Sequence, residues 1–168
     1  MTPEFRRIYR ILLVLVFGWC FLIIAAPLLK TSGFSPEIPN VLYRFFSRVC
    51  HQFDDRSLHL SGEKLAVCIR CSSIYFSFLI TILFYPFLHR WHEWKTPPRV
   101  LLLIAVTPMF IDVVLNFSGL HFSTLWTRLA TGAWFGGVLP LFILPPLLEA
   151  ALQFSFLRKG SLNARKAK

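Results

Sequence analysis

The sequence predicts an all-α polytopic membrane protein with four transmembrane helices and a short amphipathic helix outside the membrane. Of its 168 residues, 55% are hydrophobic and 16% are aromatic, which is too apolar for a water-soluble globule of this length. A hydrocarbon core about 30 Å thick is crossed by roughly 20 helical residues, and four apolar segments have about that length. These segments are residues 11–29, 66–88, 100–120 and 129–148.

The first apolar segment resembles a signal peptide because arginines precede it. The run is too long for a signal core, however, and Pro27 directly after Ala25 and Ala26 makes a poor cleavage site. We therefore expect an uncleaved first transmembrane helix.

The outer loop, residues 30–65, follows this first helix and is broken by two prolines. Within it, residues 41–53 place apolar and aromatic side chains at helical spacing, with basic residues between them. This pattern predicts an amphipathic helix at the membrane surface. Such a helix would carry Cys50 and His51 at its C-terminal end.

The formal net charge of +10 follows the positive-inside rule rather than indicating nucleic-acid binding. With four spans, the N-terminus, the loop 89–99 and the tail 158–168 share one side of the membrane. These segments hold eleven lysines and arginines, against six on the other side. We expect one membrane domain, residues 1–157, in the cell membrane, a basic cytoplasmic tail, residues 158–168, and both termini in the cytoplasm.

A Cys-His pair and a Cys-x-x-Cys motif mark the predicted outer side. Cys68 and Cys71 can both reach one ion from a single turn, and Cys50 with His51 can complete a tetrahedral shell that suits zinc. Neighbouring side chains on a helix point about 100° apart, so the helix must end or tighten for Cys50 and His51 to bind together.

Thiol-disulfide exchange is the competing chemistry for these cysteines. Arg70 and the start of a helix would both lower the pKa of a thiol in the Cys-x-x-Cys motif. Only three cysteines face the predicted outer side, so a relay of two pairs is incomplete. A structural disulfide from Cys50 to Cys68 or Cys71 is a third possibility. Cys20 lies within the first apolar segment and receives no role.

Ionisable residues inside membrane helices usually mark function, which singles out Asp112. Asn116 lies four residues further on the same helical face, while Arg70 and Arg128 open the second and fourth helices. In an enzyme, Asp112 would act as a general base, or Arg70 and Arg128 would hold an anion. The simpler alternative is an ion pair between Asp112 and Arg128 that only fixes helix packing.

Two groups of motifs resemble the small membrane proteins grouped as domain of unknown function 2085. The first group is Cys50-His51-Gln52, Arg56-Ser57, Gly62, Cys68-x-Arg70-Cys71 and Ile74-Tyr75, and the second is Pro108, Asp112, Asn116, Arg128 and Thr131-Gly132. The resemblance covers roughly residues 40–140 and implies that these residues form one site, adding Arg56 and Tyr75 to the candidates. This chain departs from the family pattern at Ile69 and at Ser73, where the family has glycine. The family implies no known activity.

The expected function is a zinc site at the outer membrane boundary, in an enzyme that acts on a lipid or isoprenoid phosphate. Two alternatives stay open: a membrane thiol-disulfide oxidoreductase that passes electrons to a quinone, and a non-enzymatic metal-stabilised subunit of a membrane complex. The expected partners are the lipid bilayer and an amphiphilic small molecule, without nucleic acid. The sequence does not define the oligomeric state.

Overall fold

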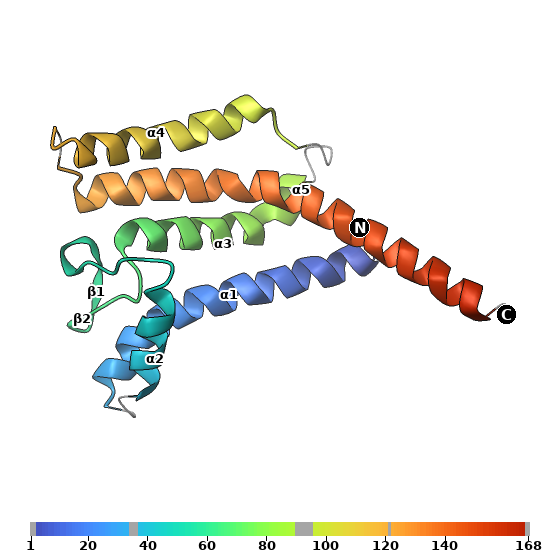
Figure 1. Cartoon of the computed structure of the whole chain (residues 1–168), viewed down its shortest axis with the longest axis horizontal. Helices are drawn as coiled ribbons and strands as arrows, with labels where there is room; N and C mark the ends of the chain where they lie inside the picture. Colours follow the sequence, from blue (N-terminus) through green and yellow to red (C-terminus); the bar gives the residue numbers. More distant parts are fainter. Residues whose placement is uncertain (1–2, 34–36, 90–95, 121, 167–168) are drawn as a thin grey trace.

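The computed structural model is a bundle of four long helices with a small folded unit at one end (Figure 1), and it describes residues 3–33, 37–89, 96–120 and 122–166. The long helices are α1 (Pro3–Thr31), α3 (Ile69–His89), α4 (Arg99–Phe117) and α5 (Leu125–Lys166). Each contains a stretch long and apolar enough to cross a membrane. The prediction of an all-α protein with four spans is therefore confirmed.

The first and last helices extend beyond the apolar segments that predicted them. Helix α1 begins at Pro3, and α5 continues to Lys166, so that residues 158–166 of the basic tail are helical. An apolar segment marks only the part of a helix that lies in hydrocarbon, whereas backbone hydrogen bonding continues into polar sequence. Residues 167 and 168 lie outside the described part of the tail.

The chain runs back and forth along the bundle, so its two termini lie toward the same end (Figure 1). The opposite end carries the elements that connect α1 to α3. These are α2 (Glu37–Phe46), the 3-10 turn η1 (Asp54–Arg56) and the strands β1 (His59–Leu60) and β2 (Glu63–Lys64). We call this end, with the first turns of α3 and α5, the site end.

Helix α3 packs closely along α5 because glycines remove side chains from the contact. A Cβ atom added at Gly136 would collide with the backbone oxygen of Ile74, and one at Gly132 would meet Ser73. Small residues four apart allow this approach of two membrane helices. The Thr81 hydroxyl adds a hydrogen bond of 3.0 Å to the backbone oxygen of Gly137.

Two buried clusters hold the bundle at its two ends. The site-end cluster consists of Ile23, Ala26, Phe46, Cys50, Leu65, Ala66 and Val67. The cluster toward the termini consists of Tyr9, Ile82, Tyr85, Leu144 and Leu148. There the Tyr9 hydroxyl donates a hydrogen bond of 2.7 Å to the backbone oxygen of Ile82, which ties α1 to α3.

The amphipathic helix exists, but its predicted bounds and its relation to the Cys-His pair were wrong. Helix α2 ends at Phe46, so Cys50 and His51 lie beyond it. The backbone oxygen of Phe46 accepts hydrogen bonds from the N–H groups of both Val49 (3.1 Å) and Cys50 (3.0 Å). These two hydrogen bonds to one oxygen end the helix in a tight turn, after which the chain bends back toward α3.

A β-hairpin occupies part of the segment for which the sequence predicted only a loop. His59 pairs with Lys64 and Leu60 with Glu63 in antiparallel register. Ser61 and Gly62, between the strands, both have positive φ, which is typical of a type I′ turn. The hairpin is tied to α1 by a salt bridge of 2.6 Å between Lys30 and Glu63.

Candidate metal centre

The loop after α2 is held against the segment before α3 by the side chain of Gln52. Its amide nitrogen donates to the backbone oxygens of Tyr43 (2.8 Å) and Ala66 (2.7 Å). The backbone oxygen of Gln52 accepts a hydrogen bond of 2.9 Å from the side-chain amine of Lys64. Gln52 has a φ of 53°, so the chain reverses at this residue. The reversal brings the preceding Cys50 beside the Cys-x-x-Cys motif.

Three cysteine sulfurs meet at this point. The Sγ atoms of Cys50, Cys68 and Cys71 all lie within 4.8 Å of one another. The side chain of Cys50 is 7% exposed, and its sulfur accepts a hydrogen bond of 3.1 Å from the backbone N–H of Cys68. Three sulfurs at this mutual distance can act as ligands of one metal ion.

The surroundings of Cys50 favour its thiolate. Hydrogen bonds from the side chains of Cys68 and Cys71, in that order of effect, hold the pKa of Cys50 far below that of an ordinary thiol, against the opposing effect of burial. The positive end of α3, which begins at Ile69, lies beside the same sulfur. A thiolate is both the metal-binding and the nucleophilic form of cysteine.

His51 is not brought into this group of sulfurs. Its side chain is exposed, and its ring stacks on that of Phe53 with 5.8 Å between the centroids. Since neighbouring residues point in different directions, the turn that buries Cys50 directs His51 outward. Cys20 also lies outside the group, because its sulfur contacts the backbone oxygen of Tyr75 at 3.5 Å.

Asp112 forms an ion pair with Arg70, which connects α4 to the first turn of α3. The side chain of Asp112 is 7% exposed and that of Arg70 is 19% exposed. The sequence therefore correctly suggested that Asp112 forms an ion pair with an arginine, but it named Arg128 instead of Arg70. The first turn of α3 is close to α5 through the glycine contacts, and this places Arg70 between α4 and the sulfurs.

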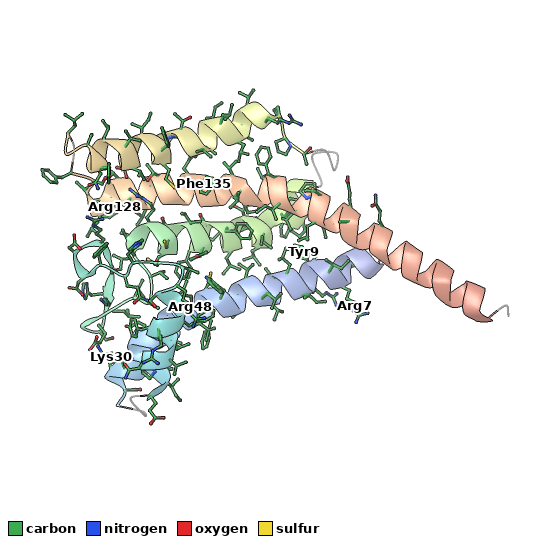
Figure 2. All side chains as sticks on the ribbon, viewed as in Figure 1. Arg7, Tyr9, Lys30, Arg48, Arg128 and Phe135 are labelled. Carbon is green, nitrogen blue, oxygen red and sulfur yellow. The ribbon has the colours of Figure 1, made fainter. Side chains whose placement is uncertain are left out.

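Arg128 and Asn116 meet as the sequence predicted. The Arg128 guanidinium donates to the side-chain oxygen of Asn116 and to the backbone oxygen of Ser123, both at 3.3 Å. Figure 2 labels Arg128 at the first turn of α5, at the site end. The backbone N–H of Ser123 also donates to Asn116 at 3.2 Å, so Asn116 joins the loop before α5 to the arginine.

The two remaining candidates, Tyr75 and Arg56, have different neighbours. Tyr75 packs beside Cys68 and Cys71 against the site-end cluster. Arg56 forms a salt bridge of 3.4 Å with the exposed Asp55 and lies over the ring of Phe53, 5.0 Å from its centroid. The candidates thus divide into a thiol cluster (Cys50, Cys68, Cys71) and an arginine cluster (Arg56, Arg70, Arg128 with Asp112 and Asn116).

An apolar cavity of about 340 Å³ adjoins the thiol cluster. Residues of α1 and α3, including Trp19 and Tyr75, form most of its lining, and α5 contributes Leu139. The indole N–H of Trp19 is buried and has no hydrogen-bond partner among the described residues. Sequence reasoning missed this cavity and the role of Gln52, because both depend on the angle between segments and on a left-handed backbone.

Comparison with known protein families identifies the family of this chain. The family described as "Predicted membrane protein (DUF2085)" matches residues 50–144, more than half of the sequence. This protein belongs to the DUF2085 family. An uncharacterized protein of Methanocaldococcus jannaschii, MJ1492, is 34% identical over 148 residues, which cover 86% of this chain and 95% of that protein. No solved structure matches the chain.

The segment that matches DUF2085 contains both clusters. It begins at Cys50 and ends at Leu144, so it includes the sulfurs, Arg70, Asp112 and Arg128 but neither α1 nor α2. Ser73 replaces the glycine of the family pattern and is buried opposite Gly132 of α5. Its hydroxyl donates to the backbone oxygen of Arg70 at 2.8 Å, which satisfies the added polar group inside the contact.

Proposed function

We propose that this membrane protein holds a zinc ion in its thiol cluster and uses it in chemistry at the membrane boundary. The mutual approach of the three sulfurs, within 4.8 Å, is the observation that carries the proposal. A disulfide would require only two of the sulfurs to meet, whereas a metal ion needs all three. Soft thiolate ligands in a near-tetrahedral arrangement favour zinc over calcium or magnesium.

A zinc ion held by these three sulfurs would keep one coordination position open, which favours a catalytic centre over a purely structural one. Among the described residues, no fourth histidine, cysteine or carboxylate ligand joins the three sulfurs. Zinc with three protein ligands keeps a position for water or substrate, and bound water reaches a pKa of about 7. Metal-assisted hydrolysis is the reaction class that this arrangement favours.

The apolar cavity supports an amphiphilic substrate, such as a lipid or an isoprenoid derivative. Trp19 and Tyr75 belong both to its lining and to the surroundings of the sulfurs. A hydrocarbon chain in the cavity would direct its polar end toward the metal. Pockets of this kind, apolar with a few polar groups, are typical of small-molecule sites.

Asp112 fits a positioning role better than that of a general base. Its carboxylate is buried and already engaged in the ion pair with Arg70. The pair fixes the first turn of α3, from which Cys71 projects toward the other sulfurs. Through the pair, α4 therefore contributes to the geometry of the thiol cluster.

Thiol oxidation by a quinone is the second candidate function, and the cavity beside a thiolate is the observation that favours it. Two thiols of the cluster would become one disulfide and release two protons and two electrons, which reduce a quinone in the cavity to a quinol. Aromatic lining from Trp19 and Tyr75 suits a flat ring.

The test is metal analysis of protein purified without chelator, combined with thiol alkylation. We expect about one zinc per chain and alkylation only after a strong chelator is added. Cys50→Ser, Cys68→Ser and Cys71→Ser should each abolish bound metal. Cys20→Ser is the matched control, because Cys20 is a buried cysteine outside the group and should leave the metal in place.

Other outcomes of the same measurements would favour one of the competing functions. Less than about a tenth of an equivalent of any transition metal, with labelling that depends on reductant instead of chelator, would exclude the zinc site and favour the oxidoreductase. Loss of the metal in His51→Ala would mean that the exposed histidine turns inward and closes the shell. That result would favour a non-enzymatic, metal-stabilised subunit.

The orientation in the membrane belongs to the same proposal. Because basic residues concentrate in the segments at the end opposite the site end, we place both termini in the cytoplasm and the zinc on the outer side. A reporter that is active only outside the membrane, fused after Lys168, should be inactive. An active reporter would move the site to the cytoplasmic side.

A further inference from the structure

The arginine cluster contains a buried positive charge without an acidic partner. The side chain of Arg128 is 7% exposed, yet its hydrogen bonds go to the neutral oxygens of Asn116 and Ser123. No carboxylate in the described ranges forms a salt bridge with Arg128. A guanidinium stays protonated in proteins, and burying an unpaired charge is costly. Asp112 acts on Arg128 from a distance, but no acidic group of the described chain contacts this guanidinium directly.

Two further guanidinium groups lie near Arg128. The charges of Arg56 and Arg70 are both close enough to act on it. Arg70 gives one nitrogen to Asp112, while its Nε is buried without a hydrogen-bond partner among the described residues. The only acidic partner of Arg56 there is Asp55, whose side chain is 73% exposed. Among the described residues, Asp112 is thus the one buried carboxylate beside these three arginines.

We propose that the arginine cluster binds a phosphate group through Arg56, Arg70 and Arg128. Guanidinium groups present paired N–H donors that match the oxygens of phosphate, and a single phosphate accepts hydrogen bonds from several of them. Helices α3 and α5 both begin at this end, and the positive ends of their dipoles add to the attraction for an anion.

The position of the cluster allows two sources of phosphate. Arg128 lies in the first turn of the candidate membrane span that begins at Leu125, and Arg56 lies outside the spans. A phospholipid head group could enter from the bilayer, and free phosphate could enter from water. The site is separate from the thiol cluster, because Arg70 contacts α4 whereas Cys71 packs toward α1 and α2. The proposal does not depend on the metal.

Binding is tested on the purified full-length protein in a phosphate-free maltoside detergent. Inorganic phosphate is titrated by calorimetry in one arm. In the other arm, the protein is reconstituted in phosphatidylcholine vesicles with or without phosphatidic acid, and retained lipid is measured by native mass spectrometry. Saturable phosphate binding assigns the site to free phosphate, and selective retention of phosphatidic acid assigns it to a lipid head group. Either result supports the proposal if the arginine variants bind the phosphate or the phosphatidic acid more weakly.

The variants are chosen so that folding and binding are separated. Arg128→Lys keeps the charge but loses the paired donors, and Arg56→Gln changes a side chain that is 40% exposed. Each should weaken binding about tenfold or more, since charged hydrogen bonds are lost. Arg44→Gln is the control, because this exposed arginine of α2 belongs to the same end but not to the cluster. Its binding should equal that of the unchanged protein.

Three outcomes would overturn the proposal. In the first, neither phosphate nor phosphatidic acid binds. In the second, binding is the same in folded Arg56→Gln and Arg128→Lys as in the unchanged protein. In the third, binding is lost in Cys50→Ser and kept in the arginine variants, which would place the anion on the metal instead. Phosphate binding that persists in Cys50→Ser keeps the arginine site even if the zinc proposal fails.

Discussion

The thiol cluster and the arginine cluster meet at the first turn of α3 but are built in opposite ways. The sulfurs come from residues 50–71, a short stretch of chain whose backbone is fixed by Gln52. The arginines come from η1, α3 and α5, and their charge exceeds that of the one buried carboxylate beside them. The first region is assembled by local hydrogen bonds, whereas the second depends on the packing of separate helices.

Asp112→Asn should produce the largest change and should affect the arginine cluster first. Removing the carboxylate leaves Arg70 buried without a counter-charge, which we expect to cost about 3–5 kcal/mol of unfolding free energy. Thermal unfolding in detergent measures the loss, and added phosphate should recover part of it.

Asp55→Asn is the matched control for this change. It breaks an ion pair whose side chains are 40% and 73% exposed, and we expect a loss of less than about 1 kcal/mol. Equal melting temperatures for Asp112→Asn and the unchanged protein would contradict the structural role of the pair.

Gly132→Ala should disturb the arginine cluster while leaving the sulfurs in place. The added methyl group meets Ser73 and the backbone oxygen of Arg70, so α5 must shift relative to α3. Overpacking of this kind costs about 1–3 kcal/mol, and we expect unchanged zinc content with weaker phosphate binding. Gly18→Ala is the control, because nothing lies within 4 Å of its added carbon. A metal content that falls with Gly132→Ala would show that the two clusters are not separable.

Gln52→Asn should have the smallest effect and should act on the thiol cluster alone. Asparagine tolerates positive φ, but its shorter side chain cannot reach both Tyr43 and Ala66. We expect zinc affinity to fall about tenfold in competition with a chelating dye, as for other residues that support metal ligands. Gln52→Glu should behave alike, because a carboxylate cannot donate to the two carbonyl oxygens. Unchanged affinity in both variants would mean that the loop is fixed by other contacts.

The sequence predicted the parts of the molecule that depend on composition and spacing. Apolar length identified the four spans, and the Cys-x-x-Cys motif with the distant Cys50 predicted the three sulfurs that meet. It also placed Asn116 and Arg128 at one end, because helix polarity alone fixes which ends of the spans are neighbours.

Features that depend on backbone direction were not predicted. The turn after Phe46 separates His51 from Cys50, although the two are adjacent in sequence. The sequence named Arg128 as the partner of Asp112, whereas the structure pairs Asp112 with Arg70, which opens a helix at the same end. The hairpin was missed although Ser61-Gly62 is a recognised turn signal, because strands of two residues leave no periodic pattern.

The order of the ligands along the chain has a consequence for biosynthesis. The three cysteines of the thiol cluster precede the middle of α3, and the residues that surround them belong to α1, α2 and the connecting loop. Once the first two spans have entered the bilayer, the ribosome has already delivered every sulfur. Arg128 arrives only with α5, the last span. If both proposals hold, metal can be loaded before the bundle is complete, whereas phosphate can bind only to the finished protein.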